Sequence, residues 1–175
     1  MRKTLSLTLM LCLTAAVAVA QDAPKKPLSP ATKAEAKIGG KNITIDYSAP
    51  SKRGRVIMGD LVPYGQVWRT GANAATKLTT EADLMIGSLH VPAGTYSLYT
   101  IPGEKEWTLI VNKKYGMSGS QYDEAQDLGR VKMTVAPVKN TAETFAIDLK
   151  PGKGKNATLS LTWENTTASV PVIVH

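Results

Sequence analysis

The chain has 175 residues, of which 43% are hydrophobic, and its formal net charge is +7. Its basic residues are scattered rather than clustered, which argues against a nucleic-acid interface and indicates a solvated basic surface. The only cysteine is Cys12, near the N-terminus, so the rest of the chain can form neither a disulfide nor a thiolate nucleophile or metal ligand.

Residues 1–20 have the pattern of a signal peptide. Arg2 and Lys3 give a positive start, residues 4–19 are apolar and uncharged, and Ala18-Val19-Ala20 is a small-x-small cleavage pattern. We expect cleavage before Gln21; an uncleaved N-terminal anchor is the alternative. The apolar run is short for a spanning helix, and no stop-transfer pattern follows it. The sequence therefore predicts a periplasmic or secreted protein without a stable membrane span after signal cleavage.

The next segment, 21–33, reads QDAPKKPLSPATK and is rich in Pro and Lys, which is typical of a flexible linker. The remainder, 34–175, is expected to form a single domain. Apolar residues there alternate with a period of two, which predicts strands. We expect these strands at 42–48, 83–87, 88–92, 95–101, 106–112, 130–138, 144–150, 157–164 and 169–175.

Turn-forming residues separate these runs, so the sequence predicts an all-β fold of roughly nine strands. We expect an antiparallel β-sandwich, jelly-roll or immunoglobulin-like. Pro171 cannot donate to a ladder and indicates that the last strand lies near an edge. The one long interruption is 113–129, where QYDEAQDLG is expected to form a long loop or a short helix.

Few residues offer familiar catalytic chemistry. The only histidines are His90 and the terminal His175, so we expect no metal site and no cofactor. His90 falls in a short expected strand, where a structural role is more common than catalysis. Carboxylates are present, but no spacing selects a pair for hydrolysis.

The segment GDLVPYGQVWRTGANAATKL, 59–78, concentrates the candidate ligand-binding residues Trp68, Arg69 and Asn73, with Arg55 just upstream. An exposed Trp offers a platform for a sugar or planar ligand, and the two guanidinium groups suit a carboxylate, sulfate or phosphate. In this interpretation Arg55 serves mainly the ligand, while Arg69 both orders the loop and faces the ligand.

A structural interpretation of the same residues is equally concrete. Trp68 would plug one end of the sandwich, and Arg69 would donate to carbonyls of the following turn. Asn73 would occupy a left-handed or Asx-turn position. The sequence leaves both interpretations open.

Three stretches together resemble a known family: YSAPSKRGRVIMGDLVPYGQVWRTGANAAT, PAGTYSLYTIPGEKEWTLIVN and a near-terminal LTWE. They are similar to the bacterial exported proteins called domain of unknown function 2911, over about Ser29 to the chain end. The resemblance implies an exported, mostly β domain with no assigned activity and supplies no catalytic residues. The positions that match its signature are Tyr47, Pro50, Gly54, Arg55, Gly59, Trp68, Arg69, Gly71, Asn73 and Thr76.

These observations support three hypotheses. The first is a non-catalytic binding module of the cell envelope, whose partner is a glycan, a small anion or an envelope protein. The second is a hydrolase that acts on envelope glycan or another polymer through carboxylates near the Trp68 loop. The third is a structural module that pairs through an exposed edge strand.

Overall fold

The computed structural model describes residues 28–175; the expected signal peptide and most of the expected linker lie outside this range. The strands are β1 (Ala31–Ile38), β2 (Lys41–Ser48), β3 (Thr76–Thr80), β4 (Leu84–Ile86), β5 (Leu89–Val91), β6 (Gly94–Ile101), β7 (Glu106–Asn112), β8 (Asp127–Pro151) and β9 (Asn156–Val174). Within this range, no helix has the length and apolar character needed to cross a membrane.

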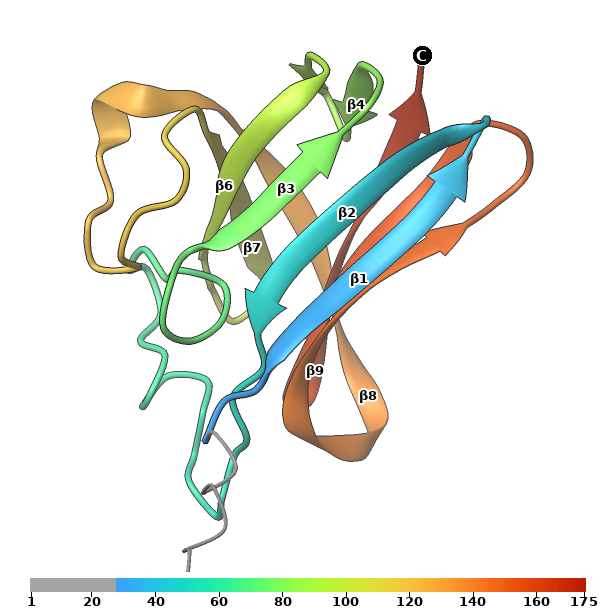
Figure 1. Ribbon diagram of the computed structural model, residues 1–175. Helices are drawn as coiled ribbons and strands as arrows, with labels where there is room; N and C mark the ends of the chain where they lie inside the picture. Colours follow the sequence, from blue (N-terminus) through green and yellow to red (C-terminus); the bar gives the residue numbers. More distant parts are fainter. Residues whose placement is uncertain (1–27) are drawn as a thin grey trace, which may run out of the picture.

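The nine strands form one hydrogen-bonded sheet in the order β1-β2-β3-β6-β7-β8-β9-β4-β5. Every neighbouring pair is antiparallel (Figure 1). The prediction of an antiparallel all-β fold with about nine strands is confirmed. The expected packing as a sandwich stays a prediction: the hydrogen bonds form one continuous ladder, because two long strands carry the hydrogen bonding across the molecule.

Those two strands are β8, with 25 residues, and β9, with 19. Each joins two runs that the sequence predicts as separate strands. The first part of β8 pairs with β7, whereas its second part pairs only with β9 and lies against β1. Irregularities between Pro137 and Ala146 interrupt the register and let the hairpin bend. The hairpin thereby folds over the sheet (Figure 1).

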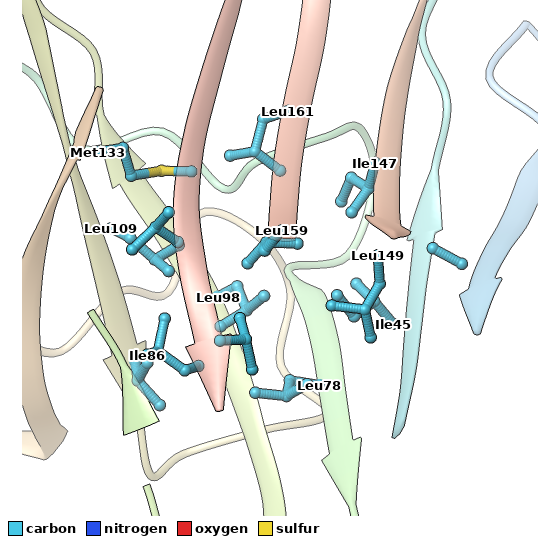
Figure 2. Close-up of a cluster of buried hydrophobic side chains, with 14 of the residues drawn as sticks. Ile45, Leu78, Ile86, Leu98, Leu109, Met133, Ile147, Leu149, Leu159 and Leu161 are labelled. Atoms are coloured by element: carbon cyan, nitrogen blue, oxygen red, sulfur yellow. The ribbon is translucent and has the colours of Figure 1, made fainter. Parts of the chain in front are cut away.

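This bend creates the core. Figure 2 shows Ile45 of β2 and Leu78 of β3 gathered with Ile147 and Leu149 of β8 and with Leu159 of β9. All five side chains belong to one buried cluster. Residues of β8 and β9 alternate between buried and exposed, so one face of the hairpin lies toward β2 and β3 and the other toward solvent.

β1 begins at Ala31, so the last residues of the expected linker belong to the sheet. The strand ATKAEAKI has weak strand propensity and only Ala34 and Ile38 are buried, so alternation alone does not reveal it. It pairs along its whole length with β2, from Ala31 opposite Ser48 to Ile38 opposite Lys41. Pairing with β2, and not the local sequence pattern, therefore determines that these residues form a strand.

The interruption at 113–129 contains a loop and a 3₁₀ helix, Glu124–Gln126. Buried Asn112 fixes it, because its Nδ2 donates to the Asp123 carbonyl at 2.9 Å and to Asp127 Oδ1 at 2.8 Å. The hydroxyl of Tyr122 donates to Asp127 Oδ2 at 2.7 Å. The expected loop or short helix is therefore confirmed, and both its ends are anchored.

Candidate functional site

Between β2 and β3 the chain leaves the sheet as a long connection, residues 49–75, which lies over one end of the fold (Figure 1). Three isolated antiparallel bridges fasten it: Ser51 with Thr144, Trp68 with Thr100 and Ala74 with Ser118. The connection therefore touches β8, β6 and the loop after β7. We call it the 49–75 connection below.

Glu164 of β9 holds the first half of the 49–75 connection. Its carboxylate accepts from the backbone N–H groups of Ile57 at 3.2 Å and Met58 at 3.3 Å, and it pairs with Lys52 Nζ at 3.3 Å. Burial raises the pKa of this carboxyl, but the two N–H donors and Lys52 outweigh burial and lower it below its usual value. The ionised form is thus the one that anchors the connection.

Trp68 lies in an aromatic cluster that includes all three tryptophans of the chain and its single phenylalanine. Its ring stacks on Trp163 with centroids 5.9 Å apart and an interplanar angle of 19°. It meets Phe145 edge-on at 5.0 Å and Trp107 at 6.3 Å. Its backbone also exchanges hydrogen bonds with Thr100 at 2.7 and 2.8 Å. Trp68 therefore joins the connection to the core.

Arg55 is tied to its own turn. Its Nε donates to the carbonyl of Lys52 at 3.0 Å, and Nη2 donates to the carbonyl of Ser51 at 2.8 Å. Two of its five N–H donors are thus committed to backbone carbonyls. This is the role that the structural interpretation of the sequence assigned to Arg69.

Arg69 differs from Arg55. Its Nε is buried and has no hydrogen-bond partner among residues 28–175, and Arg69 forms no ion pair with any of them. Its aliphatic stem is covered by Gly119 of the loop after β7, which leaves no room there for a Cβ atom. A buried donor of a charged group without a partner is costly, so Arg69 is poised for an acceptor.

Asn73 occupies a left-handed position, with φ of +60°, and its Nδ2 donates to Ser48 Oγ at 3.2 Å. Within residues 28–175, four non-glycine residues have such positive φ: Arg53, Thr70, Asn73 and Glu164. Three belong to the 49–75 connection and the fourth anchors it. For the β-branched, fully buried Thr70 the conformation is strained. Strain of this kind concentrates at functional sites.

Two adjacent hollows open beside Trp68 and Arg69. The first has a volume of about 290 Å³, and its lining includes Pro50, Arg53, Arg55, Leu61, Trp68 and Arg69. The second has about 260 Å³ and is lined by Leu61, Val62, Pro63, Gln66, Val67, Trp68, Arg69 and Gly119. Four residues line both hollows, so the hollows are direct neighbours, and we call the two together the Arg69 cleft.

The Arg69 cleft is basic. Of the described residues that line it, three are arginines and none is Asp, Glu or His. The structure brings Arg55, Trp68 and Arg69 together here, whereas Asn73 lines neither hollow. His90 pairs instead with Asp83 at 3.1 Å, away from the cleft in the β4–β5 hairpin. Among residues 28–175 no group of three or more potential metal ligands occurs.

Sequence reasoning missed several contributors to this site. Leu61 and Gly119 carry no motif, and Glu164 lies about a hundred residues from the backbone groups it binds. Arg53 lies two residues before Arg55 but was not among the predicted site residues. Its guanidinium donates to the Leu28 carbonyl, and its backbone N–H donates to Glu143 Oε1 at 2.8 Å. The sequence feature that could have indicated Arg53 is the group of three basic residues Lys52, Arg53 and Arg55, which only Gly54 interrupts.

Comparison with known proteins gives one finding. A family model described as "Protein of unknown function (DUF2911)" matches residues 29–172. Searches of curated proteins and of solved structures find no match. The matched range includes all of the strands except the last two residues of β9, and the whole Arg69 cleft apart from Leu28, so the chain belongs to the DUF2911 family.

Proposed function

We propose that this protein is a non-catalytic binding module of the cell envelope that holds an anionic group in the Arg69 cleft. The observation that carries the proposal is Arg69 itself, whose buried Nε lacks an acceptor while its side chain lines both hollows. A carboxylate, sulfate or phosphate oxygen supplies the missing acceptor, and charge-assisted hydrogen bonds of this kind are the stronger ones.

The geometry of Trp68 favours an anion over a sugar. A sugar platform needs an open aromatic face, but Trp68 is half-buried and contacts Trp163, Phe145 and Trp107. Its ring therefore serves mainly as a wall of the cleft. The glycan hypothesis has less support than the anion hypothesis for this reason.

Two further hypotheses also have less support. A hydrolase that uses carboxylates near Trp68 needs convergent catalytic groups. In the described lining of the cleft, the only charged side chains are arginines. Edge pairing needs a long apolar edge. β5 has only three residues, and β1 carries exposed Lys33, Glu35 and Lys37, which discourage pairing.

Titration calorimetry with acetate, phosphate and sulfate tests the proposal. We expect at least one of these anions to bind, and Arg69→Gln to weaken it at least tenfold, because a charged donor is replaced by a neutral side chain of similar reach. Lys150→Gln is the matched control, since it removes the same charge from an exposed site on β8 outside the cleft. If both variants lose the same amount of anion affinity, the loss comes from the change in overall charge and not from the cleft. That result would overturn the proposal.

A further inference from the structure

The Arg69 cleft is bordered by exposed apolar side chains. In the described part of the chain, seven large hydrophobic residues are exposed, and four of them lie in the short stretch 56–67: Val56, Leu61, Tyr64 and Val67. A fifth, Leu28, lines the first hollow. A concentration of exposed apolar side chains in one short segment is typical of an interaction site.

Besides Leu28, two of these residues line the cleft. Leu61 is 45% exposed and lines both hollows, and Val67 is 39% exposed and lines the second. Arg69 lines the same two hollows. One site therefore offers a cationic donor and an adjoining strip of Leu61 and Val67, which we call the apolar rim.

The apolar rim is held in place by its own turn. Val62 N–H donates to the Ile57 carbonyl at 2.9 Å, and Gly59 N–H donates to the Val62 carbonyl at 3.0 Å. The Ile57 and Val62 side chains are buried in the core cluster. Leu61 stands between these anchors, so its exposure is imposed by a folded turn and is available without rearrangement.

We propose that the ligand of the Arg69 cleft is an anionic amphiphile, with its charged group at Arg69 and its apolar chain along Leu61 and Val67. This inference rests on the proposed function, because it specifies the molecule that carries the anion. The Arg69 guanidinium and the apolar side chains of Leu61 and Val67 line the same cleft. The described lining has no carboxylate that would repel an anionic headgroup. A purely polar anion would leave the rim uncovered, and a purely apolar ligand would leave Arg69 without an acceptor.

A series of straight-chain carboxylates tests the inference: acetate, butyrate, hexanoate, octanoate and decanoate, each below its micelle concentration. We expect affinity to rise with chain length by up to about fourfold per methylene, the ratio equivalent to 0.8 kcal/mol. The rise should level off once the chain extends past the rim. Arg69→Gln should weaken the longer carboxylates strongly and leave decanol binding unchanged.

Rim variants separate this inference from the proposed function. Leu61→Ser and Val67→Ser should flatten the chain-length dependence, with a much larger loss of affinity for decanoate than for acetate. Ile173→Ser is the matched control, because Ile173 is 41% exposed on β9 and lines neither hollow. If acetate binds but chain length adds nothing, the amphiphile inference fails and the anion site stands. If no anion of any length binds, both fail. A chain-length dependence that survives both rim substitutions would also overturn the inference.

Vesicles identify the source of the amphiphile. Sedimentation with phosphatidylglycerol vesicles, with phosphatidylcholine vesicles for comparison, distinguishes a bilayer lipid from a free one. Retention on the anionic vesicles that is lost in Arg69→Gln and in Leu61→Ser assigns the headgroup to a membrane lipid. Decanoate binding without vesicle retention assigns it to a free amphiphile. Either result supports the site.

Discussion

Arg55 and Arg69 line the same hollow, but only Arg55 donates from its guanidinium to backbone carbonyls. The buried Nε of Arg69 has no partner in the described chain. The sequence led us to expect that Arg55 serves mainly the ligand and that Arg69 both orders the loop and faces the ligand. Spacing alone could not assign these roles, because they depend on which carbonyls the turn at Ser51 and Lys52 leaves open.

The two arginines should therefore differ in their effect on stability. Arg55→Ala removes two hydrogen bonds from the Ser51–Lys52 turn and should cost about 1 kcal/mol, since exposed hydrogen bonds contribute modestly. Arg69→Gln removes a half-buried guanidinium whose buried Nε has no partner in the described chain, and it should leave stability unchanged or raise it. Thermal unfolding of both variants, with Lys150→Gln alongside, gives the comparison. A larger loss in Arg69→Gln than in Arg55→Ala would contradict these assignments.

Removal of the Trp68 ring should destabilise the protein strongly. Trp68→Ala opens a gap among Trp163, Phe145 and Trp107, and large-to-small changes of this kind cost about 3–5 kcal/mol in a core. Because Trp68 is only half-buried, we expect the lower end, with roughly 2–4 °C of melting temperature per kcal/mol. Trp68→Phe keeps an aromatic ring and should lose less. A melting temperature for Trp68→Ala within about 2 °C of wild type would contradict its role in the core.

Much of the fold could be predicted from the sequence, because β-strands with one buried face alternate visibly. The alternation at 144–150 and 157–164 gives the buried residues Phe145, Ile147, Leu159 and Leu161. The continuation of the run at 144–150 into a long strand is not visible, because Lys139 and Asn140 indicate a turn. In the structure they form the irregular middle of β8.

The last strand was expected near an edge because of Pro171. β9 lies between β8 and β4, and only the two short strands β4 and β5 follow it in the sheet. The ladder with β8 ends at Ser169 and the ladder with β4 starts at Val172, so Pro171 falls between them and no N–H is missed. The candidate site has a similar limit: sequence reasoning found Trp68 and Arg69, whereas Leu61 and Gly119 join them only through tertiary packing.

Glu164 should make the fold sensitive to acid. Its folded-state pKa lies below the usual value of 4.5, because N–H groups of Met58 and Ile57 and the Lys52 ammonium outweigh burial. The ionised carboxylate therefore stabilises the fold above the unfolded-state pKa, and this contribution is lost as the pH falls through the folded-state value. Glu164→Gln should melt earlier than wild type at neutral pH, and the difference should shrink as the pH falls below 4.5 and through the lowered folded-state pKa. A difference that is constant with pH would exclude this ionisation as its cause.

The proposed envelope location depends on the first twenty residues. If they act as a signal peptide, the exported protein begins at Gln21 and contains no cysteine. Its intact mass should match a chain from Gln21 to His175, and dithiothreitol should leave its melting temperature unchanged. A mature protein that still contains Arg2 and Lys3 would contradict export with cleavage and favour an uncleaved anchor.

Gly119 provides a steric test of how the loop after β7 closes over Arg69. A Cβ atom there would overlap the Arg69 side chain and lie 2.6 Å from the Asn73 carbonyl oxygen, so Gly119→Ala must displace one of them. Overpacking of this kind costs about 1–3 kcal/mol. We expect faster hydrogen exchange at Ser118 and Ala74, which form a bridge beside it, and weaker anion binding in the cleft.

Gln121→Ala is the matched control for Gly119→Ala, because it changes an exposed, uncharged residue of the same loop outside the cleft. It should leave both exchange and binding as in wild type. If Gly119→Ala speeds exchange but leaves anion affinity unchanged, the loop is a cover that does not position Arg69. If neither quantity changes, the close contact between Gly119 and Arg69 does not shape the cleft in solution, and the 49–75 connection must position the guanidinium without the loop.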